Sequence, residues 1–267
     1  MLLQVPWGLD RIGARATADD GRGVHAYVID TGVRKSHQEF DGRADWIGDF
    51  VGGDPASANA DDCDPPSPAS GHGTHVASIL GGRTFGVARA VRIHALRILP
   101  CTGTTRTDMH AAVRAIDWIT AHGTRPAVVN ISPARWQTDD KSVDIALRRS
   151  IAAGFTYVLS AGGLPDLARF TPQRVAEAIV VAATGPEGRN EDRYGPLLTL
   201  YAPGSQIEAA GRASDTATFT GDGDSYAAPF AAGVAALYLQ RHPDAPAEEV
   251  KRAIVRSASN GMLHVIQ

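Results

Sequence analysis

Residues 24–32 read Val-His-Ala-Tyr-Val-Ile-Asp-Thr-Gly, and this stretch decides the expected architecture. Its apolar run, residues 24–29, has the length and composition of a buried strand, and a turn that begins with Asp30 follows at once. Similar apolar runs lie at residues 91–99, 127–131, 155–159 and 178–183. Helix-like stretches lie between and after them, at residues 73–80, 107–119, 143–153, 225–240 and 247–257. This alternation predicts an α/β fold with a mainly parallel central sheet covered by helices on both faces.

Length and composition narrow the classes of protein. A chain of 267 residues with 43% hydrophobic residues can bury one large core, so we expect residues 1–267 to form a single domain and act as a monomer. The formal net charge of -3 gives no basic surface for a phosphate backbone, so nucleic acid is not an expected partner. No apolar run approaches the roughly 20 residues of a membrane span. Residues 1–5 are too short for a signal peptide, and neither a signal peptide nor a propeptide is expected in this chain.

Three distant segments carry side chains suited to one reaction. Asp30 follows its strand directly, His72 lies in Gly-His-Gly-Thr-His, and Ser225 lies in Gly-Asp-Ser-Tyr-Ala-Ala-Pro. In parallel sheets ligands bind beyond the carboxyl ends of the strands, where Asp30 is expected to lie. His72 and Ser225 each open a helix, where backbone N–H groups favour negative charge. A serine hydroxyl becomes a nucleophile when an imidazole takes its proton and a carboxylate orients that imidazole. We therefore predict Ser225 as nucleophile, His72 as base and Asp30 as the orienting carboxylate.

The order Asp, His, Ser along the chain is the one that subtilisin-type hydrolases use. The sequence resembles the subtilase family of serine peptidases, and within it the proteinase K and aqualysin branch. The resemblance covers nearly the whole chain and is carried by residues 6–12, 28–32, 36–40, 71–77, 115–118, 174–178, 202–204 and 231–239. It implies a subtilisin-like three-layer fold and a serine hydrolase that cleaves peptides or proteins through an acyl-enzyme. It also implies a catalytic triad of Asp30, His72 and Ser225, with His75 as a structural neighbour.

Cys63 and Cys101 are the only two cysteines. Their spacing alone leaves open a bridge or two unpaired thiols, and two cysteines do not make a structural zinc site. The resemblance places both where this branch carries a disulfide, which implies a Cys63–Cys101 bridge worth about 2–4 kcal/mol. A bridge favours secretion into an oxidising compartment. If Met1 is the native start and no propeptide exists, the alternative is a cytoplasmic location.

The oxyanion region departs from the family pattern. The family uses an asparagine side chain at the position of Gly163, so one donor is missing and the N–H of Ser225 remains. In subtilisin itself, losing that donor costs on the order of 10²–10³ in kcat. The residue before the nucleophile, usually threonine, is Asp224, and we expect its carboxylate to face away from the oxyanion or to be protonated.

The two edges expected to hold the substrate also differ from the family pattern. Subtilases bind peptide as an added strand, which depends on open main-chain groups. Here one edge begins at Ser132 and continues with Pro133, which has no N–H to donate, and Ala134. The other edge contains Gly103 and Thr105. Because Ala134 and Thr105 stand where glycines normally let the peptide approach, the edges indicate either drift in a divergent peptidase or a changed substrate or function.

No cofactor or metal is expected. Calcium needs several oxygen ligands with net negative charge, and Thr199, Gly13 and Ala14 occupy positions where the family has ligands. Residues 52–70 read as a long surface loop without an element of its own. Its acidic residues are either a new cation site or simply solvated: Asp61, Asp62 and Asp64.

Three functions remain open from sequence. The first is a slow or narrowly specific subtilisin-like serine endopeptidase. The second is an esterase, acyltransferase or peptide ligase or cyclase with the same triad, since activated esters demand less oxyanion stabilisation than amides. The third is a weakly active or non-catalytic binding homologue, against which the three retained triad residues argue.

Overall fold

A seven-stranded parallel sheet forms the centre of the structure. The computed structural model describes residues 6–52, 59–63, 71–100, 108–132, 135–188 and 194–266. The strands lie in the order β2-β3-β1-β4-β6-β8-β9, and each neighbouring pair is parallel. Their bounds are β1 (His25–Asp30), β2 (Ala44–Asp49), β3 (Arg92–Arg97), β4 (Ala127–Ile131), β6 (Thr156–Ser160), β8 (Ile179–Thr184) and β9 (Leu200–Pro203).

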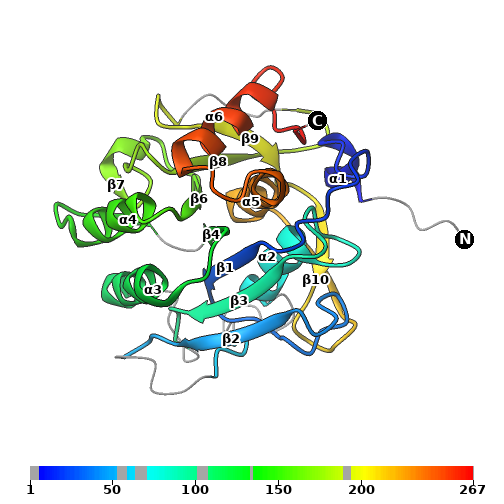
Figure 1. The fold of residues 1–267 in the computed structure, drawn as a ribbon, viewed down its shortest axis with the longest axis horizontal. Helices are drawn as coiled ribbons and strands as arrows, with labels where there is room; N and C mark the ends of the chain where they lie inside the picture. Colours follow the sequence, from blue (N-terminus) through cyan, green and yellow to red (C-terminus); the bar gives the residue numbers. More distant parts are fainter. Residues whose placement is uncertain are drawn as a thin grey trace, which may run out of the picture.

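Helices cover both faces of this sheet. The described helices are α1 (Trp7–Arg11), α2 (His72–Gly81), α3 (Met109–His122), α4 (Ser142–Ala152), α5 (Asp224–Arg241) and α6 (Ala247–Ser257), with a short 3-10 turn η1 (Leu167–Arg169). In Figure 1, α3 and α4 lie on one side of the sheet, whereas α2 and α5 lie on the other with α6 beside α5. The predicted α/β class with a covered parallel sheet is therefore confirmed.

Successive residues of a strand pack into two separate apolar cores, one on each face of the sheet. Val28 of β1 and Val128 of β4 pack in the core on the side of α2 and α5, whereas Ile29 and Val129 pack in the core on the side of α3 and α4. Side chains of a strand alternate between the two faces of a sheet, so a strand buried on both faces is apolar throughout. This is why the sequence shows largely apolar runs at β1, β4, β6 and β8, whereas β3 includes exposed and half-buried positions.

The sequence pattern did not predict several of the strands. The edge strand β2 has exposed and half-exposed positions and a register shift between Trp46 and Gly48, so it lacks a clean pattern. The other edge strand, β9, is only four residues long and ends at Pro203. Two antiparallel pairs lie outside the main sheet, β10 (Ile207–Ala210) with β11 (Thr218–Gly221) and β5 (Trp136–Gln137) with β7 (Phe170–Thr171).

The described part of the 52–70 loop is not simply a solvated surface loop. Residues 53–58 and 64–70 lie outside the described residues, but Ala60 is fully buried and Asp62 is 3% exposed. The carbonyl of Ala60 accepts the N–H of Val33, and Asp62 accepts hydrogen bonds from buried groups near the sheet. The expectation of a plain surface loop was therefore wrong for residues 60 and 62.

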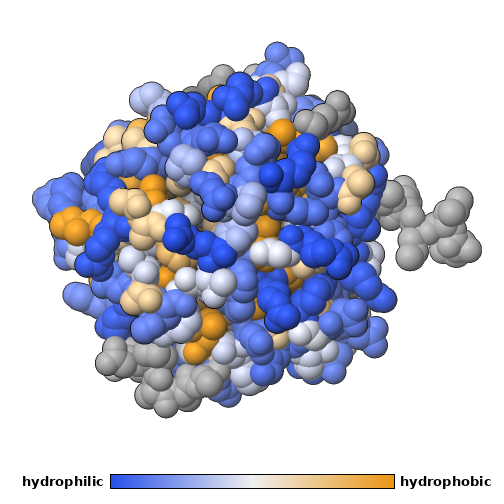
Figure 2. Space-filling view, in the orientation of Figure 1, coloured by the Kyte–Doolittle hydropathy of each residue, from blue (hydrophilic) through white to orange (hydrophobic). Residues whose placement is uncertain are grey.

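The visible surface in Figure 2 is mainly hydrophilic, with small scattered apolar patches. The described helices include none with both the length and the apolar character that a membrane crossing requires.

Candidate active site

Asp30 and His72 meet at the carboxyl end of β1. Asp30 is the last residue of the strand and is fully buried, and His72 is the first residue of α2. The Nδ1 of His72 lies 2.7 Å from Oδ1 of Asp30, and the N–H of Thr31 donates to the same oxygen at 2.8 Å. A proton on Nδ1 between these atoms leaves Nε2 as the basic nitrogen, which is the tautomer a general base needs.

A glycine allows this approach. Gly73 follows His72, and a Cβ atom at Gly73 would lie 2.0 Å from the carbonyl oxygen of Gly32. Because no side chain fits there, the first turn of α2 lies directly against the loop that follows β1. The Gly-His-Gly segment read from the sequence thus has a packing reason as well as a chemical one.

Ser225 lies at the same edge of the sheet. It is the second residue of α5, and its hydroxyl donates to the carbonyl of Ser132 at 3.3 Å. Ser132 directly follows β4, which is the neighbour of β1 in the sheet. The next residue, Tyr226, places its ring 5.6 Å from the ring of His72 between centroids. The structure therefore brings the segments of Asp30, His72 and Ser225 together, and their catalytic roles stay predictions.

Ser132 supports the backbone at the nucleophile. Its side chain is buried, accepts a hydrogen bond from the amide of Asn130 at 2.8 Å and donates to the carbonyl of Ser225 at 2.9 Å. Sequence reasoning placed Ser132 at a substrate edge, whereas its hydroxyl contacts the start of α5. The other predicted edge residues lie outside the described residues: Gly103, Thr105, Pro133 and Ala134.

His75 is a buried neighbour of the site. Its ring lies 4.4 Å from Tyr226 and 5.7 Å from Phe219 between centroids. Burial, and then the charge of His72, lowers the pKa of His75 to about 3. His75 is therefore neutral near pH 7 and fills space beside the site as an uncharged ring.

Gly163 and Asp224 are hydrogen-bonded to each other. The N–H of Gly163 donates to Oδ2 of Asp224 at 2.6 Å, and the N–H of Ala183 donates to Oδ1 at 2.7 Å. The hydroxyl of Tyr194 also donates to Oδ1, at 3.4 Å. Asp224 is 8% exposed, and its carboxylate faces the loop that contains Gly163. Sequence reasoning missed this contact, because it joins two segments 61 residues apart.

A cavity of about 530 Å³ opens beside Ser225. Its lining includes Gly163, Tyr194, Asp222 and Arg135. Charged groups of both signs therefore line the cavity that contains Ser225, in contrast with a purely apolar pocket.

The residues present do not fit a family calcium site. The hydroxyl of Thr199 accepts the N–H of Val180 at 3.0 Å, and neither Gly13 nor Ala14 offers a side-chain oxygen. Asp62 is engaged in hydrogen bonds inside the protein. Within the described ranges, no group of three or more histidine, cysteine or acidic side chains is arranged to hold a metal ion.

The predicted disulfide falls partly beyond the described residues. Cys63 is described, and its N–H donates to the carbonyl of Thr31 at 3.4 Å, but Cys101 lies outside the described ranges. The Cys63–Cys101 bridge stays a prediction.

The chain is similar to serine proteinases in both sequence and structure. The model of the Subtilase family matches residues 21–266. An extracellular serine proteinase of Thermus sp. (strain Rt41A) is 40% identical over 95% of this chain and 61% of its own length, and alkaline serine exoprotease A of Vibrio alginolyticus is 38% identical over 96% and 47%. A crystal structure of a cold adapted subtilisin-like serine proteinase superposes with a TM-score of 0.87 at 33% identity, over 98% of this chain and 99% of that one. The chain thus spans about half to three fifths of the length of these two curated relatives.

Proposed function

Because the chain belongs to the subtilase family, we propose that it is a serine endopeptidase that cleaves peptide bonds through an acyl-enzyme on Ser225. The observation that carries the proposal is the 2.7 Å contact between His72 Nδ1 and the buried carboxylate of Asp30, beside the segment of Ser225. This contact sets the tautomer in which Nε2 accepts a proton.

The proposed reaction follows from this arrangement. Nε2 of His72 takes the hydroxyl proton as Oγ of Ser225 attacks the carbonyl carbon, and then gives that proton to the leaving amine. Water then attacks the acyl carbon of the acyl-enzyme while Nε2 of His72 takes a proton from it. Nε2 gives that proton to Oγ of Ser225 as the acid is released. The buried charge of Asp30 stabilises the imidazolium that forms in each half of the reaction.

We propose that cleavage is slow or narrowly specific. The N–H of Ser225, at the start of α5, supplies one donor to the oxyanion, and the dipole of the helix adds to it. Gly163 has no side-chain donor, and its N–H is already bonded to Asp224. Electrostatic stabilisation of the oxyanion is therefore weaker than with two aimed donors.

The rival functions have no specific observation in their favour. No relative reported above carries the name of an esterase, an acyltransferase or a ligase. The hydrogen-bonded Asp30–His72 pair is what catalysis requires, and a binding protein has no need of it.

We also propose a substrate class, an oligomeric state and a location for the protein. The substrate is a peptide or protein, and the protein acts as a monomer without nucleic acid or membrane partners. Secretion is proposed because the Thermus relative is named an extracellular proteinase and because the predicted Cys63–Cys101 bridge requires an oxidising compartment.

Labelling with a serine-reactive fluorophosphonate tests the proposed nucleophile. We expect mass spectrometry to find the label on Ser225, and expect Ser225→Ala to abolish both labelling and peptide turnover. His72→Ala should be nearly as severe because no base remains to take the proton. Persistent labelling of Ser225→Ala at another serine would contradict the assignment.

A further inference from the structure

We propose that Asp62 is a positioning residue of the active site, whose buried carboxylate holds the first turn of α2, and with it His72, against Asp30. The inference rests on the proposed function, because it assigns Asp62 a part in keeping the base in place. Asp62 acts through Thr31 and Thr74, which lie between it and the site.

The first turn of α2 has N–H groups that need acceptors from elsewhere. The residue before the helix is Gly71, which has no side chain to cap it. The first N–H groups of a helix have no partner inside the helix. Here the N–H of Gly73 donates to the hydroxyl of Thr31 at 2.9 Å, and the N–H of Thr74 donates to Oδ2 of Asp62 at 2.8 Å. Two other segments thus cap the helix that carries His72.

Thr31 connects this cap to Asp30. A hydroxyl has one proton to donate, and the proton of Thr31 points to Oδ1 of Asp62 at 2.9 Å. This fixes the rotation of the hydroxyl and leaves a lone pair for the N–H of Gly73. The backbone N–H of Thr31 donates to Asp30 at 2.8 Å, on the oxygen that contacts His72. Thr31 therefore contacts both Asp30 and Gly73, the residue that follows His72, and Asp62 orients its side chain.

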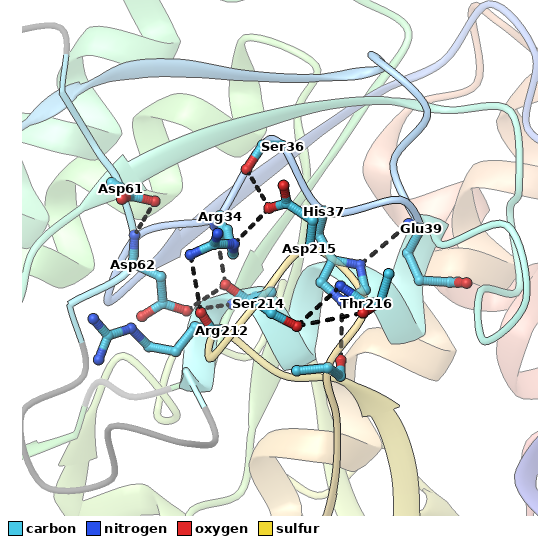
Figure 3. A network of polar contacts seen from close by, with 12 residues as sticks. Arg34, Ser36, His37, Glu39, Asp61, Asp62, Arg212, Ser214, Asp215 and Thr216 are labelled. Carbon is cyan, nitrogen blue, oxygen red and sulfur yellow. Dashed lines mark hydrogen bonds and ion pairs between the residues drawn. The ribbon is translucent and has the colours of Figure 1, made fainter.

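Thr74 connects Asp62 by hydrogen bonds to Arg34. Its hydroxyl donates to Oδ2 of Asp62 at 2.5 Å and accepts the N–H of Arg34 at 3.0 Å. The guanidinium of Arg34 bonds Asp215 and the carbonyl of Arg212. Figure 3 shows the contacts of Arg34 with the turn of residues 212–216, and Asp62 lies at one side of this network.

The space around Asp62 is closed. A Cβ atom on Gly71, which has a φ of +60°, would lie 2.7 Å from Oδ2 of Asp62 and 2.4 Å from Cβ of Arg212. Asp62 is 3% exposed, and burial raises the pKa of its carboxyl group, with the charge of Asp30 acting in the same direction. The hydrogen bonds from Thr74 and Thr31 oppose this shift. Removing the carboxylate leaves these buried donors without their acceptor, which favours a displaced first turn of α2.

The test compares Asp62→Ala and Asp62→Asn with the wild-type protein, using peptide turnover per fluorophosphonate-titrated site. A displacement of about 1 Å in a catalytic group can cost about 10²-fold in rate. We expect Asp62→Ala to lower kcat by about 10- to 10²-fold with KM nearly unchanged. Asp62→Asn should recover part of the loss, because its amide oxygen still accepts the N–H of Thr74. The NMR signal of the His72 Nδ1 proton should broaden in Asp62→Ala.

Asp144→Ala is the matched control. Asp144 is also a buried carboxylate, bonded by the side chains of Thr171 and Arg174 on the opposite side of the sheet from α2. Its removal should lower stability without changing kcat per titrated site or the His72 signal. Wild-type kcat in both Asp62 variants, with a sharp His72 signal, would overturn the positioning role. If Ser225 of the wild-type protein takes no label, the proposed function fails instead, while the His72 signal still tests the role of Asp62.

Discussion

At the scale of single residues, two departures from the family pattern meet at one hydrogen bond. Gly163 replaces the expected oxyanion donor, Asp224 replaces the expected threonine, and the N–H of the first bonds the carboxylate of the second at 2.6 Å. The carboxylate also bonds the N–H of Ala183 and so ties the Gly163 loop to β8 and α5. The two changes therefore form one local arrangement that holds the loop in place without supplying an oxyanion donor.

Gly163→Asn tests the missing donor. The backbone at Gly163 has a φ of +67°, which asparagine tolerates better than most residues, and a Cβ there meets no atom within 4 Å. If the side chain reaches the oxyanion, kcat on a peptide should rise by up to about 10²-fold with KM about the same. Gly163→Ala, which adds bulk but no donor, is the control. Equal or slower turnover of amide and activated-ester substrates by Gly163→Asn would contradict a damaged oxyanion hole and indicate a remodelled site.

At the scale of elements, the sequence predicted what depends on local pattern. The strands β1, β4 and β6 are buried on both faces, so their apolar runs stand out, and the residues at their carboxyl ends follow from sheet geometry. The edge strand β2 mixes exposed and buried positions and was missed.

The same limit applies to the site. Asp30, His72 and Ser225 were predictable because each lies in a distinctive motif. Asp62 and Asp224 were not predicted in their observed roles, because their partners lie 12 to 61 residues away and only the folded chain brings them together.

A histidine pair between β1 and β3 predicts how stability depends on pH. The ring of His94 stacks on Tyr27, and its Nε2 lies 2.8 Å from Nδ1 of His25. Burial, then the charges of His25 and Arg92, lowers the pKa of His94 to about 4, while Asp45 opposes the shift. A histidine in the unfolded state has a pKa of about 6.5. Between that value and about 4 the unfolded state binds more protons, so the unfolding free energy falls as pH falls.

His94→Gln should flatten this dependence. The slope that His94 contributes is at most about 1.4 kcal/mol per pH unit. Urea unfolding at a series of pH values across this window measures it. His122→Gln, which changes an exposed histidine at the end of α3, should leave the slope unchanged. Identical slopes for wild type and His94→Gln would show that the pair does not resist protonation.

At the scale of the whole molecule, the sheet separates two apolar cores and holds the site at one edge. The helices that begin at the site, α2 and α5, pack on the same face of the sheet, so one core supports both His72 and Ser225. Because both cores share the same central strands, we propose that residues 1–267 fold as one domain. The tertiary framework of the described residues includes this packing of helices on both faces of the sheet.

Calcium removal tests that framework. A ligand that binds only the native state stabilises it by RT ln(1 + [L]/Kd), so a bound ion would make the melting temperature depend on free calcium. The hydroxyl of Thr199 is bonded to the N–H of Val180, and Asp62 is bonded to Thr31 and Thr74, so neither is poised to ligate an ion. We therefore expect EDTA to leave the melting temperature nearly unchanged, with added magnesium as a control for ionic strength. A large drop with EDTA that calcium but not magnesium reverses would place a calcium site elsewhere in the chain.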